Sequence, residues 1–169
     1  MAQHFRMFAD YNRWANARLY EACGLLSDEE FRADKGAFFG SAQRTLNHLL
    51  AADRIWLKRF TGEGVVPASL DTPLYETFAD LRNARAAEDQ RIIDWVDTLT
   101  EADLSAIISY KPVTMPDKIE LPLGPLLSHV FNHQTHHRGQ VHTVLTALGR
   151  PSVVLDLVYF LLGDGKRWQ

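Results

Sequence analysis

Cysteine is almost absent, because Cys23 is the only one in 169 residues. A lone cysteine cannot form a disulfide within the chain, which excludes a small secreted domain held together by disulfides and agrees with a reducing compartment. Cys23 falls on the apolar side of an expected helix. We therefore interpret it as a small core residue and not as a nucleophile.

An excess of basic residues and long apolar runs are absent as well. The net charge is −3, so a surface that follows nucleic-acid phosphates is not expected. No stretch approaches the length of a membrane-spanning helix, and the first residues (M-A-Q-H-F-R-M) lack the apolar segment of a signal peptide. We expect a cytoplasmic protein without nucleic-acid or membrane partners.

The sequence has instead the composition of an ordinary globular protein and four stretches with helical periodicity. Apolar residues make up 46% and charged residues 23%. Apolar side chains recur at helical spacing over residues 3–26, 41–60, 75–99 and about 125–149. Four long helices predict an all-α four-helix bundle, and the lack of repeats and linkers predicts one domain over residues 1–169.

The segments between these helices are unusual for a simple up-and-down bundle. Residues 61–73 form a long loop with two glycines and two prolines, and residues 107–110 and 118–121 have strand-like content around a proline-containing turn. We expect crossover connections and a small β-hairpin before the last long helix. The apolar stretch Val153–Leu162 predicts a final short helix, with Asp156 as a buried carboxylate.

Charged side chains interrupt the apolar stripes of the second and third helices. Asp53 lies in the middle of its stripe and needs either a basic side chain or a histidine ring as partner. Arg85 and Glu88 lie three residues apart in the next stripe, and we interpret them as an ion pair.

Histidine is concentrated in the fourth helix, where Ser128–Gly149 holds five of the seven histidines. A projection at about 100° per residue places His133 and His137 on the apolar face, one turn apart. Two imidazoles at this spacing suit a divalent metal, while a hydrogen-bonded core pair is the alternative. The remaining histidines lie at the margin of the face or on its far side: His129, His136 and His142.

A metal site with open positions usually has three protein ligands. His48 is the best remaining candidate, because it lies on a second long helix among apolar neighbours. It sits at the edge of the apolar arc, where a surface histidine is the alternative. The spacing along the sequence does not show that His48 lies near His133 and His137 in the folded protein.

Several phrases, spread over nearly the whole chain, form a set. They are Y-N-R-W-A-N at 11–16, T-L-N-H-L-L-A-A-D-R-I-W-L at 45–57, H-V-F-N-H-Q-T-H-H-R-G-Q-V at 129–141, and A-L-G-R-P and L-D-L-V-Y-F near the end. In this order they resemble the DinB-like (DinB/YfiT) family of metal-binding four-helix bundles. The phrase H-x-x-x-H-R-G-Q is the most specific.

The resemblance implies a site and a class of function. It implies three metal ligands, His48 from N-H-L-L and His133 and His137 from H-x-x-x-H-R-G-Q, with water or a bound ligand in the other positions. It also implies a metal-dependent enzyme acting on a small molecule, either a transferase that uses a low-molecular-weight thiol or a hydrolase. Zinc is the expected metal, with nickel or iron as alternatives, and homodimers are common in such a family.

Other residues and other functions fit the same pattern. A non-catalytic protein that binds metal in sensing or stress responses is one alternative. A bundle that acts through dimerisation or partner binding, with a vestigial site, is another. Within the enzyme hypothesis, five further side chains could orient the rings or a substrate: Asp53, Gln140, Arg138, His129 and His136.

Overall fold

The computed structural model describes residues 1–67, 73–112 and 116–169. Four long helices dominate it: α1 (Ala2–Cys23), α3 (Ala42–Thr61), α4 (Phe78–Thr98) and α5 (Leu123–Ala147). The shorter elements are α2 (Asp28–Arg32), the 3₁₀ turn η1 (Asp103–Ser105), β1 (Ile107–Tyr110), β2 (Ile119–Pro122), α6 (Leu157–Leu162) and η2 (Lys166–Trp168). The expected four-helix bundle is confirmed.

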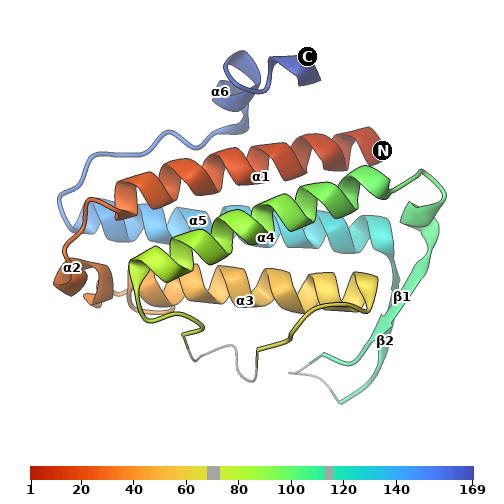
Figure 1. Ribbon diagram of the computed structural model, residues 1–169, viewed down its shortest axis with the longest axis horizontal. Coiled ribbons are helices and arrows are strands. Elements are labelled where there is room, and N and C mark those ends of the chain that lie inside the picture. The colour runs from red at the N-terminus through yellow and green to blue at the C-terminus, as the bar shows by residue number, and fades with distance from the viewer. Residues whose placement is uncertain (68–72, 113–115) are drawn as a thin grey trace.

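The order of the helices around the bundle confirms a crossover. Helix α1 packs against α4 and α5, and α3 packs against the same two helices, so α1 and α3 occupy opposite corners. Figure 1 shows that α3 and α4 run in the same direction, while α1 and α5 run in the other. The connection from α3 to α4 must therefore return along the length of the bundle.

Local capping residues set the helix boundaries. Ser27 forms a capping box with Glu30 at the start of α2, and the Ser41 side chain accepts a hydrogen bond from the Arg44 amide at the start of α3. Helix α3 ends at Gly62, whose φ of 76° favours glycine. Thr77 caps α4 by accepting from the Asp80 amide, so this helix begins at Phe78, later than its apolar pattern predicts.

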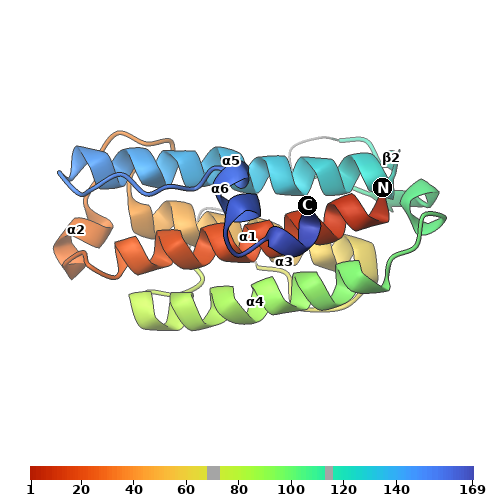
Figure 2. The same ribbon diagram turned by 90° about the horizontal axis from the view of Figure 1, so that it is seen from above.

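The hairpin is confirmed, whereas the C-terminal tail differs from its prediction. Strands β1 and β2 pair antiparallel, with Ile107 opposite Pro122. The tail becomes helical only at Leu157, and the preceding residues run extended along α1 (Figure 2). The carbonyls of Val154 and Leu155 accept hydrogen bonds from Arg18 and Tyr11 of α1, which holds this extended form.

The expected burial of Asp156 is wrong. Asp156 is exposed at the N-cap position of α6, while its neighbour Leu155 packs against the core. An extended chain turns alternate side chains to opposite sides, so the apolar residue faces the bundle and the carboxylate faces solvent.

The core contains two large apolar clusters with a polar layer between them, and a third, small cluster of Tyr11, Ala15 and Phe160 packs α6 against α1. One cluster contains Phe5 and Phe131, and the other contains Leu19, Leu145 and Cys23. Cys23 is buried, as expected, and burial raises the pKa of its thiol to about 12. The polar layer consists of buried side chains from all four long helices: Asn12, Asn16, Asp53, Arg85, Asp89, Gln134 and Arg138.

In the described part of the chain, no helix combines the length and the apolar character needed to cross a membrane.

Candidate metal centre

Three histidines from two neighbouring helices meet on one side of the bundle. His48 lies on α3, and His133 and His137 lie one turn apart on α5. One potential ligand nitrogen of each residue lies within 4.8 Å of those of the other two. The packing of α3 against α5 thus brings together the three residues that periodicity and the resemblance had selected from separate helices.

The spacing of the ring nitrogens fits a small divalent cation. Two nitrogens bound to a tetrahedral ion at about 2.0–2.1 Å lie about 3.3 Å from each other. His48 Nε2 and His133 Nε2 are 3.3 Å apart. The same distance also allows a hydrogen bond between two neutral imidazoles, since each ring has one donor and one acceptor nitrogen. His137 favours a metal site over a simple hydrogen-bonded pair, because one of its ring nitrogens lies within 4.8 Å of the nitrogens of His48 and His133.

The surroundings of His133 and His137 favour the neutral form of both rings. Burial, and then the charges of the neighbouring His137 and His48, lower the pKa of His133 to about 3. Burial also lowers the pKa of His137, although the hydrogen bond with Gln140 opposes this effect. Neutral imidazole is the form that binds metal ions, so the cluster needs little proton release to accept one.

Gln140 fixes the orientation of two histidine rings. Its Oε1 lies 2.7 Å from His137 Nδ1, and its Nε2 lies 3.1 Å from His136 Nε2. The amide oxygen can only accept, so Nδ1 of His137 carries the proton and Nε2 is left with a free lone pair. In this orientation the Gln140 amide satisfies both contacts at once.

An aromatic side chain that the sequence did not single out covers part of the cluster. Phe39 stacks on His48 with 4.1 Å between ring centroids and lies 5.5 Å from the His137 ring. It precedes Gly40, whose φ of 81° turns the chain into the Ser41 cap of α3. Helical periodicity does not reach Phe39, because it lies in the loop before α3. The available signal was an aromatic residue directly before the glycine that starts the His48 helix.

Three aromatic rings and one arginine lie beside the cluster and form what we call the rim: Trp56, Tyr110, His129 and Arg59. The guanidinium of Arg59 lies over the rings of Trp56 and Tyr110, at 4.5 and 4.4 Å from their centroids. The Trp56 ring also contacts His129, which lies 5.9 Å from His133. Burial, and then the charge of Arg59, lower the pKa of His129.

Two of the five accessory candidates lie in the polar layer. Asp53 accepts a hydrogen bond of 2.7 Å from Arg85, so its partner is the basic side chain and not a histidine. Arg138 donates to Asn12 and to Asn16 on α1. The other three candidates lie against the cluster: Gln140, His129 and His136.

The expected pairing of Arg85 with Glu88 is wrong. Arg85 forms ion pairs with Asp53 and Asp89, at 2.7 and 3.0 Å. Glu88 pairs instead with Arg54 and Arg91. Glu88 is about as buried as Asp89, at 5% against 4% exposed, but it already has two cations at hand. Asp53 and Asp89 form their ion pairs with Arg85 instead.

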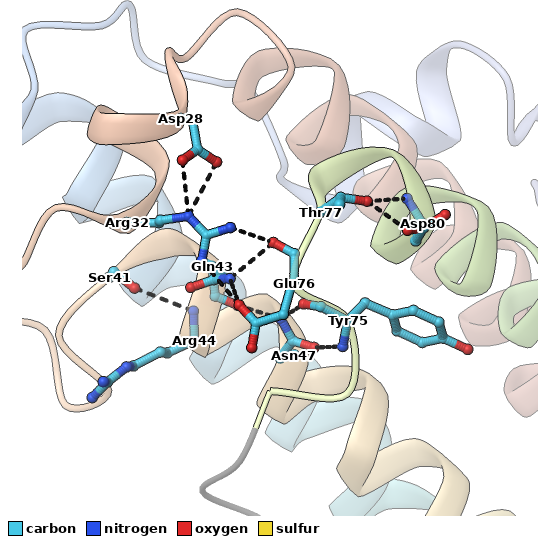
Figure 3. A network of polar contacts seen from close by, with 10 residues as sticks. All are labelled: Asp28, Arg32, Ser41, Gln43, Arg44, Asn47, Tyr75, Glu76, Thr77 and Asp80. Atoms are coloured by element: carbon cyan, nitrogen blue, oxygen red, sulfur yellow. Dashed lines mark hydrogen bonds and ion pairs between the residues drawn. The ribbon is translucent and has the colours of Figure 1, made fainter.

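A polar network anchors the part of α3 that carries His48 (Figure 3). Asn47, the preceding residue, accepts a hydrogen bond from the Tyr75 amide at 2.9 Å and donates to the Tyr75 carbonyl at 3.1 Å. Gln43 and Arg32 donate to the carbonyl of Glu76. These contacts tie α2 and α3 to the segment that leads into α4.

Comparisons with known proteins agree on one family. The family model described as the DinB family matches residues 1–166. The chain is 26% identical to "Protein DinB" of Bacillus subtilis (strain 168) over 165 residues, which cover 93% of this chain and 92% of that protein. A crystal structure of a DinB-like protein from Bacillus cereus ATCC 10987 has a similar fold, with a TM-score of 0.66 at 18% identity. It covers 87% of this chain and 95% of that one. The protein belongs to the DinB family.

Proposed function

We propose that the protein is a metal-dependent enzyme in which His48, His133 and His137 bind a divalent cation, with zinc as the first choice. The observation that carries the proposal is the meeting of three histidine rings whose potential ligand nitrogens lie within 4.8 Å of one another. Nitrogen ligands alone suit nickel or iron as well. Three protein ligands leave coordination positions open for water or a small molecule.

The proposed chemistry is activation of a nucleophile. Held by three uncharged ligands, such an ion keeps its double positive charge and lowers the pKa of a bound water or thiol, which supplies a nucleophile at neutral pH. With a low-molecular-weight thiol the reaction is S-transfer to an electrophile, and with water it is hydrolysis. Of these two reactions, we propose transfer of a thiol as the first candidate and hydrolysis as the second.

The residues around the cluster have separate tasks in this proposal. Gln140 holds the ring of His137, and Phe39 shields His48 on one side from water. Arg59 in the rim offers a positive charge for the carboxylate of a thiol cosubstrate. His129 is kept neutral by its lowered pKa and could accept the proton that the nucleophile releases.

A cobalt-substituted sample tests whether the centre has open positions. Addition of small thiols should change the visible and near-ultraviolet absorption of the cobalt protein. The same thiols should be transferred to a generic electrophile, such as monochlorobimane, faster than in chelator-treated protein.

His133→Ala should abolish both signals, whereas His4→Ala should retain them because His4 is exposed on α1. An absorption spectrum that no thiol or anion alters would refute the enzyme proposal. Full metal binding without transfer or hydrolysis would favour the non-catalytic metal-binding alternative.

A further inference from the structure

A second cleft lies between α1 and α4, away from the histidine cluster on α3 and α5. Its volume is about 310 Å³, at the lower end of the range for small-molecule sites. Helices α1 and α4 are direct neighbours (Figure 2), and residues of both helices line the cleft. Ala17 of α1 and Ala86 of α4 line it, and their methyl groups leave space that longer side chains would fill.

Two buried polar groups in the wall of the cleft lack hydrogen-bond partners. Tyr20 and Arg85 both line the cleft and are each only 3% exposed. Among the described residues, neither the hydroxyl of Tyr20 nor Nε of Arg85 has a hydrogen-bond partner. Buried groups of this kind are nearly always paired, with protein, water or ligand. Burial also raises the pKa of Tyr20, so its hydroxyl remains a donor.

The charge of the cleft favours an anion. Arg13, Arg82 and Arg85 contribute three guanidinium groups, against one carboxylate from Asp89. Asp89 is already occupied, because it pairs with Arg85 at 3.0 Å and accepts a hydrogen bond of 2.9 Å from Asn16. The positive charge that is left comes from the two outer arginines.

These outer arginines are available to a ligand. Arg82 is exposed and forms no ion pair within the described ranges. Arg13 is half exposed; it lies 3.6 Å from Asp10 and donates one hydrogen bond of 3.2 Å, to Gln90, which leaves other N–H groups of its guanidinium for a ligand. A fork of guanidinium donors matches the oxygens of a carboxylate or a phosphate.

We propose that this cleft binds a small molecule through a carboxylate or phosphate group, held by Arg82 and Arg13 and by a hydrogen bond from the Tyr20 hydroxyl. The site is independent of the metal centre and goes beyond the proposed enzymatic function. Its volume restricts the ligand to a small metabolite.

Isothermal titration calorimetry in Tris chloride tests the proposal with two probes, inorganic phosphate and succinate. We expect one saturable site per chain for at least one probe, and the tighter probe identifies the group that is recognised. Ala86→Leu fills the cleft and should abolish binding, while Ala87→Leu, one position away on the exposed surface, should not change it.

Two further pairs of measurements identify the contacts. Arg82→Gln should weaken binding at least fivefold, whereas Arg44→Gln, an exposed arginine on α3, should have no effect. Tyr20→Phe should weaken it about tenfold, which corresponds to one hydrogen bond to a charged group. Arg82 is exposed, so its replacement tests the site even if the Tyr20 variant folds poorly.

Three results would overturn the proposal. One is the absence of saturable binding of both probes, and another is equal binding by the Ala86→Leu and Ala87→Leu variants. The third is loss of binding in His133→Ala, which would place the anion at the histidine cluster and not in this cleft.

Discussion

Replacement of Arg85 by methionine should cost more stability than replacement of any exposed arginine. The guanidinium lies between two carboxylates that are almost fully buried, since Asp53 is 1% and Asp89 is 4% exposed. Removal of one partner from a buried ion pair typically costs about 3–5 kcal/mol. This is a large part of the about 5–15 kcal/mol by which a domain is stable. The expected fall in melting temperature is about 6–20 °C.

The loss should depend on pH in a defined direction. Burial raises the pKa of Asp89 to about 6 and also raises that of Asp53, and Arg85 opposes both shifts. A carboxyl group whose pKa is higher in the folded state binds protons more tightly there, so it destabilises the fold as pH rises from its ordinary range through the raised pKa. Without Arg85 both pKa values rise further, and the variant should lose less stability at pH 5 than at pH 8.

Urea denaturation followed by circular dichroism measures this effect at both pH values. Arg44→Met is the matched control, because Arg44 is exposed on α3, and its change should stay within about 0.5 kcal/mol. A loss below about 1 kcal/mol for Arg85→Met, or the same loss at pH 5 and pH 8, would contradict the role assigned to this residue.

Three other predictions concern single contacts. Gln140→Ala should weaken metal binding about 10- to 100-fold, because His137 loses the acceptor that orients its ring. Gln140→Glu should keep most of the affinity. Competition with a chromogenic chelator measures the metal affinity of both variants. Asn47→Ala should cost about 1–3 kcal/mol in urea denaturation, because the Tyr75 amide loses its partner, and a loss near zero would contradict this. Cys23, buried and with its pKa raised to about 12, should not react with a thiol reagent at pH 8 until urea unfolds the chain.

The sequence was most informative where a local pattern determines the structure. Helical periodicity predicted the four long helices, and strand-like content predicted the hairpin. The tail was mispredicted because its apolar run reads as a helix. Its extended form depends on hydrogen bonds to Arg18 and Tyr11, which are distant in sequence.

In the candidate site, too, the local features were predictable and the contacts between distant segments were not. The pair His133 and His137 follows from the spacing within one helix, but His48 lies at the edge of its own apolar arc. Only the packing of α3 against α5, or a resemblance that spans both helices, brings it to the pair. Phe39 was missed because the stacking of a loop residue on a ring depends on where the turn places it. Partners such as Arg85 and Asp53 come from different helices, which periodicity does not relate.

Metal content is the most direct test of the central claim. Elemental analysis of protein purified without a histidine tag should give close to one divalent metal per chain, with zinc as the first expectation. His48→Ala, His133→Ala and His137→Ala should each lower the affinity at least tenfold, and His4→Ala should not. A wild-type protein that lacks stoichiometric metal and fails to take up zinc, nickel or iron would contradict the account. In that case the three histidines would be a hydrogen-bonded cluster of the bundle.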